Sequence, residues 1–158
     1  MAFHLQSGVL NWPHKINLLP PNALFKGFQP QLCDEAKRNN PGLITVMRYW
    51  DDHNQNFNGG SFNAYAEAAR AFLNRFVDGT FMSLAHNVDY IEGWNEFLAN
   101  GHSIAEVQER VLWVDALTAV WNNEYRIKPE LEHIRLALCN AAIGNDIPKE
   151  IARIAYSR

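Results

Sequence analysis

Stretches typical of β-strands alternate along this chain with stretches of helical period, and this alternation limits the folds open to it. Five segments have the composition of short strands: residues 3–7, 23–28, 43–50, 88–97 and 133–142. The third, LITVMRYW, is nearly continuous in apolar residues, as expected for a strand covered on both faces. Parallel neighbours in a sheet need crossover connections, which helices supply. We therefore predict a single α/β domain over residues 1–158, with about five strand–helix units and parallel strands.

The segments between these strands show the start and stop signals of helices. Ser61 is a plausible N-cap, and Asp78-Gly79 ends the helix that follows it. A variable connection is expected after Gly79. The other predicted helices cover residues 30–39, a long segment from the capping box at Ser103 to Tyr125, and residues 149–156. The apolar stripe expected to pack the first of these long helices into the core is Phe62, Tyr65, Ala66, Ala69, Phe72, Leu73 and Phe76.

The bulk composition is that of a globular domain with a core. The 158 residues are 47% hydrophobic and 20% charged. A formal charge of -3 provides no field that attracts a polyanion, so we expect no nucleic-acid partner. No apolar run approaches the roughly 18 residues that a membrane span needs. The start MAFHLQSG lacks the features of a signal peptide, so the cytoplasm is the default location, although a mature secreted enzyme without its leader has the same pattern.

Polar and aromatic side chains gather where the predicted strands end, and ligands bind there in parallel α/β folds. No glycine-rich phosphate loop and no G-x-S-x-G motif accompanies them, which argues against nucleotide and serine-hydrolase chemistry. His4 and His53 lack a partner at ligand spacing, so we assign no metal and no cofactor. The residues at or beside these ends are Gln6, Ser7, Gln29, Arg48, Trp50, Asp51, Asp52, His53, Trp94, Asn95, Glu96, Asn140 and Asn145.

Acids, amides and aromatic rings in one place suit a carbohydrate site. Acids donate protons, amides and acids hold hydroxyl groups, and indole or phenol faces stack on a pyranose ring. The candidate site residues are Glu96 together with Trp94, Asn95, Arg48, Trp50 and Asn140, the last five as residues that would bind the substrate. The alternative from a different class is a non-catalytic carbohydrate-binding or scaffold domain, in which Trp50, Trp94 and Asn95 bind a glycan without cleaving it.

The run Trp94-Asn95-Glu96, at the end of the fourth predicted strand, resembles the strand-four signature of a large clan of (β/α)8-barrel retaining glycoside hydrolases. The resemblance implies that Glu96 is the general acid/base and that Asn95 hydrogen-bonds the sugar 2-hydroxyl. Members often carry an arginine on an early strand near the nucleophile, and Arg48 is the candidate here. Phe97 stands where the clan usually has proline. The resemblance covers these three residues and their place in the strand order.

The same resemblance implies a nucleophile that this chain lacks, because the clan's second glutamate ends strand seven. A (β/α)8 barrel typically takes about 250 residues. We therefore expect residues 1–158 to be the first five units of a larger barrel, inactive or nearly so when isolated. Such a chain is expected to self-associate or to pair with a missing carboxyl-terminal barrel portion. A smaller open sheet is the alternative architecture.

Other residues are expected to serve packing or local structure. Glu92 shares strand parity with Glu96, and a salt-bridged core position is the commoner outcome for such an acid. Asp51 and Asp52 are more often loop caps than catalysts. The helical Trp113 and Trp121 are expected to be packed, and Cys33 and Cys139 to be buried thiols, with a disulfide between them left open.

Overall fold

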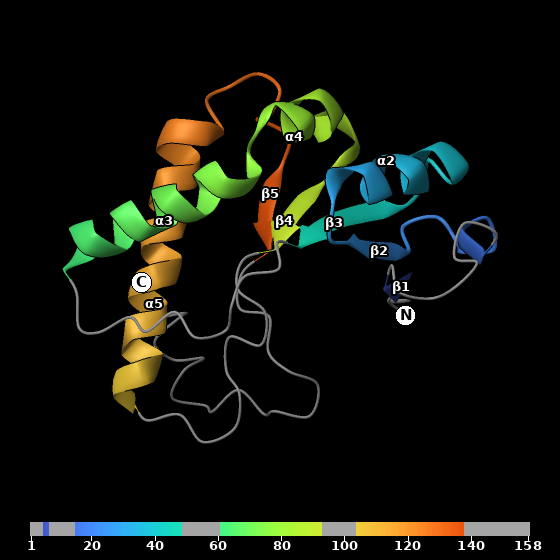
Figure 1. Cartoon of the computed structure of the whole chain (residues 1–158). Helices are drawn as coiled ribbons and strands as arrows, with labels where there is room; N and C mark the ends of the chain where they lie inside the picture. The colour runs from blue at the N-terminus through green and yellow to red at the C-terminus, as the bar shows by residue number, and fades with distance from the viewer. Residues whose placement is uncertain (1–4, 7–14, 49–60, 93–103, 138–158) are drawn as a thin grey trace.

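The computed structural model describes residues 5–6, 15–48, 61–92 and 104–137 (Figure 1). Five parallel strands form one sheet in the order β1-β2-β3-β4-β5, which is also their order in the chain. Each strand falls within a predicted one, so the α/β class and the parallel sheet are confirmed. The strands are β1 (Leu5–Gln6), β2 (Leu24–Gly27), β3 (Ile44–Arg48), β4 (Tyr90–Glu92) and β5 (Arg135–Ala137).

Helices lie between consecutive strands from β2 onward. The predicted helix 30–39 is confirmed with both its limits, and the next begins after the predicted cap, since Ser61 Oγ accepts a hydrogen bond from the Ala64 N–H at 3.4 Å. Ser103 and the predicted helix 149–156 lie outside the described residues. The helices are α2 (Pro30–Asn39), α3 (Phe62–Phe76), α4 (Gly79–Leu84) with the 3-10 turn η1 (Ala85–Asn87), and α5 (Ile104–Val120) continued by η2 (Trp121–Tyr125).

The variable connection expected after Gly79 contains a short helix, α4, which was not predicted. The Asp-Gly pair that ends α3 also starts this helix: Asp78 Oδ1 accepts a hydrogen bond from the Phe81 N–H at 2.8 Å. Phe81 is fully buried. The cap and this single buried ring stabilise a helix of six residues, which is too short for an apolar period to show in the sequence.

The end of the long predicted helix is a π-turn rather than an α-turn. In η2 the Arg126 N–H donates to the Trp121 carbonyl at 2.8 Å, five residues back. Tyr125 donates to Asn74 Oδ1 of α3 at 2.5 Å. The Arg70 guanidinium donates hydrogen bonds of 2.6–2.9 Å to the Glu124 carboxylate, and these hydrogen bonds lower the pKa of Glu124. The wider turn thus presents two neighbouring side chains to α3.

Strand alternation directs one set of side chains to the helices. Phe25 packs with Ala36 of α2, whereas Met47 and Ile91 belong to the larger cluster with α3, α4 and α5. Side chains that point to the other face alternate with these along each strand. All described helices therefore cover one face of the sheet, which we call the outer face. The opposite face is called the inner face.

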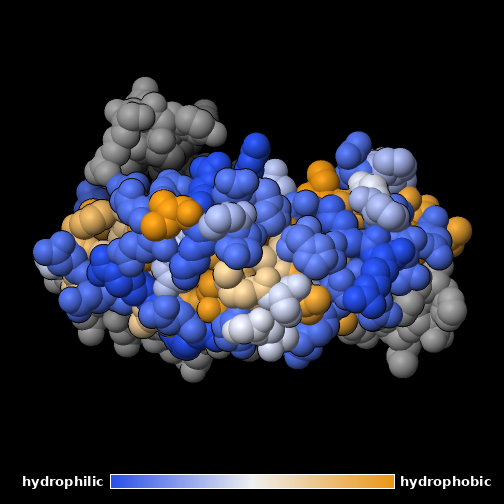
Figure 2. All heavy atoms as spheres, turned by 90° about the horizontal axis from the view of Figure 1, so that it is seen from above, coloured by the Kyte–Doolittle hydropathy of each residue, from blue (hydrophilic) through white to orange (hydrophobic). Residues whose placement is uncertain are grey.

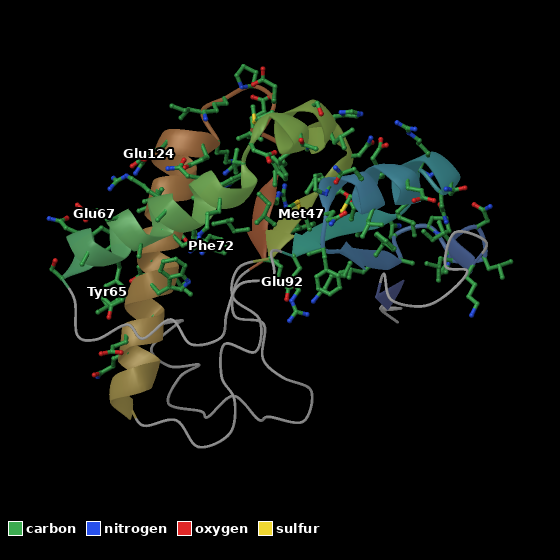
Figure 3. All side chains as sticks on the ribbon, viewed as in Figure 1. Met47, Tyr65, Glu67, Phe72, Glu92 and Glu124 are labelled. Carbon is green, nitrogen blue, oxygen red and sulfur yellow. The ribbon has the colours of Figure 1, made fainter. Side chains whose placement is uncertain are left out.

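Among the helical aromatic side chains that the structure describes, the outer core confirms the expected packing with one exception, Phe62. Trp113 is 3% and Trp121 1% exposed, and the Phe72 ring meets Trp113 edge to face at 5.9 Å between centroids. Phe62 was expected in the core and is 46% exposed. It is the first residue of α3 and lines an open groove with Ala119 and Val120 of α5, which leaves part of its ring exposed to solvent. Figure 3 shows Tyr65 and Phe72 between α3 and α5, and Glu67 directed away from them.

The surface away from the sheet is mainly polar. The view onto the top of the molecule shows a hydrophilic face interrupted by separate apolar patches (Figure 2). Scattered exposed apolar residues of this kind, such as Leu18 and Ile127, are common on folded proteins. Among the described helices, none has the length and apolarity needed to cross a bilayer.

The contact between β2 and α2 depends on the missing side chain of Gly27. A Cβ built at Gly27 lies 3.0 Å from Leu32 Cβ and 3.3 Å from the Phe25 ring, whereas one at Gly79 meets nothing within 4 Å. We expect Gly27→Ala to lower the free energy of unfolding by about 1–3 kcal/mol through overpacking. Gly79→Ala, at the start of α4, should leave it unchanged or raise it by up to about 1 kcal/mol. Urea unfolding followed by tryptophan fluorescence measures both, and equal midpoints for the two variants would contradict this packing.

Candidate functional site

The inner face carries charged side chains close to the carboxyl ends of three neighbouring strands. Lys26, Arg48 and Glu92 alternate with the residues that face the helices, and Arg48 and Glu92 are register partners on β3 and β4. Val46 is 4% exposed yet belongs to neither of the two apolar clusters, because it also points to this face. The inner face therefore carries charged side chains beside the apolar Val46, and we take it as the candidate site.

An ion pair crosses this face from β2 to β4. Lys26 Nζ lies 2.5 Å from Glu92 Oε2, and the side chains are 11% and 3% exposed. Lys26 is in register with Val46 of β3, so the pair bridges two strands over the middle one. Figure 3 shows Glu92 at the end of β4. The salt-bridged core position expected for Glu92 is confirmed.

Arg48 extends this charged group toward β2. It is 5% exposed, and its guanidinium carbon lies 5.7 Å from the centroid of the Phe28 ring. An arginine over an aromatic face keeps its planar donors directed sideways. Two cations and one carboxylate thus lie together on the inner face. Among the candidate catalytic and substrate-binding residues, Arg48 is the one within the described part of the chain.

Of the other polar residues named at predicted strand ends, Gln6 is the last residue of β1 and Gln29 is the N-cap of α2. The remaining predicted site residues lie outside the described residues. These follow the carboxyl ends of β3, β4 and β5 in the sequence: Trp50, Asp51, Asp52, Trp94, Asn95, Glu96 and Asn140. The sheet order makes β4 the fourth strand in space as well as in sequence, so Trp94-Asn95-Glu96 follows a true fourth strand.

Lys26 was missed as a site residue. The signal was present in the sequence, since Lys26 stands between Phe25 and Gly27, and alternation sends it to the face opposite theirs. Reading that face as functional also required knowledge that the described helices cover the other one. The partner, Glu92, lies 66 positions later in the chain, and only strand register brings the two together.

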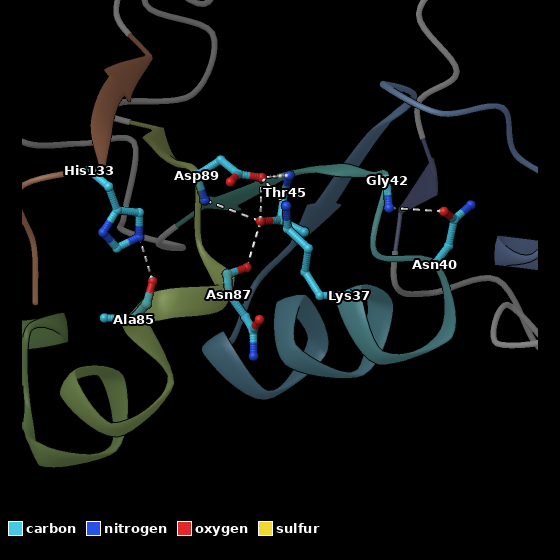
Figure 4. Close-up of polar contacts among 8 residues, drawn as sticks. All are labelled: Lys37, Asn40, Gly42, Thr45, Ala85, Asn87, Asp89 and His133. Carbon is cyan, nitrogen blue, oxygen red and sulfur yellow. Dashed lines mark hydrogen bonds and ion pairs between the residues drawn. The ribbon is translucent and has the colours of Figure 1, made fainter.

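A second polar cluster lies at the opposite, amino-terminal edge of the sheet (Figure 4). Asp89 Oδ2 accepts a hydrogen bond from the backbone N–H of Thr45 at 2.7 Å, and Lys37 Nζ lies 2.8 Å away. Thr45 in turn donates to the Asn87 carbonyl at 2.6 Å. These contacts tie the start of β4 to β3 and α2, which is a stabilising role typical of that edge in α/β barrels.

Two surface hollows accompany these elements. An open pocket of about 460 Å³ at the amino-terminal edge is lined by residues that include Lys37, Asp89, His133 and Arg135. Its Lys37 and Asp89 are paired with one another. A groove of about 290 Å³ lies between α3 and α5, and the ion-paired Arg70 and Glu124 are among its lining residues. Neither lies at the carboxyl ends of the strands, so the inner face remains the better candidate.

Metal and thiol chemistry find no support in the described residues. No group of three or more His, Cys, Asp or Glu side chains within them is arranged to hold a metal ion. Cys33 is a free, fully buried thiol, as expected, while Cys139 lies outside the described ranges. Burial, with a smaller effect from Asp89, raises the pKa of the Cys33 thiol from 9.0 to about 12. Cys33 is thus a packing residue between α2 and the sheet.

The raised pKa makes Cys33 a reporter of folding. In a Cys139→Ser background, we expect Cys33 to react with Ellman's reagent at pH 8 at least about 100-fold more slowly than in 6 M urea, because the folded state buries the thiol and disfavours the thiolate. The free energy of unfolding should fall as pH rises from about 9 to about 12, since only the unfolded state releases this proton there. Cys33→Ala should flatten that fall. Rapid labelling of the native protein would contradict the buried placement.

Comparison with known proteins adds no name to this site, because no family model, no curated protein and no solved structure matches the chain.

Proposed function

We propose that this chain forms the first five strand–helix units of a (β/α)8-barrel retaining glycoside hydrolase, with Glu96 as general acid/base. The sequential parallel strand order is the observation that carries the proposal. In doubly wound sheets the order reverses at a switch point, and helices cover both faces. Here every connection steps in the same direction, and the described helices cover one face. A sheet of this kind covers its inner face by closing on itself.

The position and chemistry of the inner face support the same proposal. Barrel enzymes act at the carboxyl ends of their strands, where Lys26, Arg48 and Glu92 lie. The run Trp94-Asn95-Glu96 begins two residues after β4 ends. Asn95 would hold the sugar 2-hydroxyl, and Trp50 and Trp94 would offer faces to the pyranose ring. Asn140 would approach from the end of β5.

The proposed reaction is a double displacement. Glu96 would protonate the glycosidic oxygen as a second carboxylate attacks the anomeric carbon, and would then remove a proton from the water that releases the sugar. The second carboxylate belongs to a later strand of the barrel. The two carboxyl groups of a retaining site lie about 5 Å apart, so strands four and seven must share one closed barrel.

The acid/base role is tested by substituting Glu96 in the complete natural protein. We expect Glu96→Gln to lower kcat roughly 10²–10⁴-fold on glycosides with alkyl leaving groups. The loss should be much smaller for 2,4-dinitrophenyl glycosides, whose leaving group needs no proton. Glu67→Gln, on the exposed side of α3, is the matched control and should retain full activity. Equal turnover by Glu96→Gln and the wild type on every glycoside would refute the role, and glycan binding without hydrolysis by the wild type would select a carbohydrate-binding domain instead.

The association state tests the barrel itself. Within the described residues, β5 pairs only with β4, so its far edge presents backbone groups to a further strand. We expect the isolated 158-residue chain to self-associate, or to bind a carboxyl-terminal barrel portion added to it. Sedimentation velocity across a 100-fold concentration range measures this. A monodisperse monomer with a single cooperative unfolding transition would favour the open-sheet alternative.

A further inference from the structure

We propose that the open pocket at the amino-terminal edge of the sheet binds the phosphate group of a small phosphate ester. Described residues of α2, of the turn before β3 and of the starts of β4 and β5 line this pocket. Its volume of about 460 Å³ lies in the range of small-molecule sites and exceeds what a phosphate ion alone fills. The pocket lies at the opposite end of the strands from the proposed catalytic residues, so the inference does not depend on the glycosidase.

The pocket carries an excess of positive charge. Among its described lining residues, Lys37 and Arg135 are the cations and Asp89 is the one acid. These charges sum to +1, and a protonated His133 raises the sum to +2. The Asp89 carboxylate is already engaged, because its Oδ2 atom lies 2.8 Å from Lys37 Nζ and 2.7 Å from the Thr45 nitrogen. An anion that enters the pocket is therefore attracted.

The Arg135 guanidinium is available to such an anion. Arg135 is exposed, and among the residues that the structure describes its side chain has no acidic partner. An exposed arginine on a strand is by itself an ordinary solvated residue. This one differs because it shares a concave site with a second cation, Lys37. A guanidinium offers two parallel donors that match a phosphate group, and an ammonium adds a point charge.

Polar groups of neighbouring strands surround the same space. Tyr90 and Arg135 are register partners on β4 and β5, so their side chains leave the sheet on the same side. Tyr90 brings a phenolic hydroxyl to the pocket. His133 Nε2 lies 3.1 Å from the Ala85 carbonyl oxygen, which only accepts, so Nε2 carries a proton and this contact does not use Nδ1 (Figure 4). Donors from α2, β4 and β5 suit the several oxygens of a phosphate better than the two of a carboxylate.

Calorimetric titration of the complete natural protein at constant ionic strength tests this site. The probes are glycerol 3-phosphate, inorganic phosphate and glycerol. We expect glycerol 3-phosphate to bind more tightly than inorganic phosphate, because it fills more of the pocket, and glycerol not to bind. Arg135→Gln should weaken the binding of glycerol 3-phosphate by about 10- to 100-fold. Arg75→Gln removes the same charge from an exposed position of α3, and this matched control should change binding by less than about twofold.

Three results would overturn the assignment. The first is the absence of binding by either phosphate at about 10 mM. The second is equal weakening by Arg135→Gln and Arg75→Gln, which would show attraction to the net charge only. The third is tighter binding of glycerate than of glycerol 3-phosphate, which would show a carboxylate site.

A second variant keeps the test valid if near-UV circular dichroism shows that Arg135→Gln is unfolded. Tyr90→Phe removes only a hydroxyl group and should weaken the binding of glycerol 3-phosphate by about 3- to 10-fold. Undiminished binding by Tyr90→Phe would then count against the site. Because the readout is binding of a phosphate rather than turnover of a glycoside, this result and that for Glu96 are independent.

Discussion

The sequential pairing of parallel strands is the constraint on which the rest of this structure depends. Each crossover from one strand to its neighbour is right-handed in nearly all proteins, so crossovers that step in one direction place their helices on one face. The helices α2 to α5 follow this rule, and their apolar stripes meet Phe25, Met47 and Ile91 there. The two faces of the sheet consequently acquire different chemistry. One is an apolar core, and the other carries Lys26, Arg48 and Glu92.

The amino-terminal and carboxyl edges of the sheet carry different polar contacts, and we assign them different roles. At the amino-terminal edge, the Asp89 carboxylate is surrounded by donors from Thr45 and Lys37, and these short contacts connect β3, β4 and α2. At the carboxyl edge, the described charged side chains, Lys26, Arg48 and Glu92, are more deeply buried, and they come from the strands rather than from the connections. Such a division suits an α/β barrel, in which the lower face maintains the fold and the upper face is available to a substrate.

Much of the architecture was predictable from local pattern. All five strand segments, the limits of α2 and the Ser61 cap were read from periodicity and breakers, because these signals act within a few residues. The helix α4 was not predicted, because Asp78 follows the end of one helix and also caps the next. The π-turn η2 was not predicted either, because it forms through contacts of Glu124 and Tyr125 with α3. Phe62 was misplaced because an apolar stripe does not tell how closely two helices pack at each point, and at Phe62 an open groove separates α3 from α5.

For the candidate site, the sequence by itself determined which residue types follow each strand, and it placed Trp94-Asn95-Glu96 after the fourth strand by counting. Only the tertiary structure decided the order of the strands in space, the face of the sheet that the described helices cover, and the partnership of Lys26 with Glu92. The physical reason is that alternation assigns a side chain to one of two faces, whereas the crossovers and the register between strands decide which face is covered and which distant residues meet there.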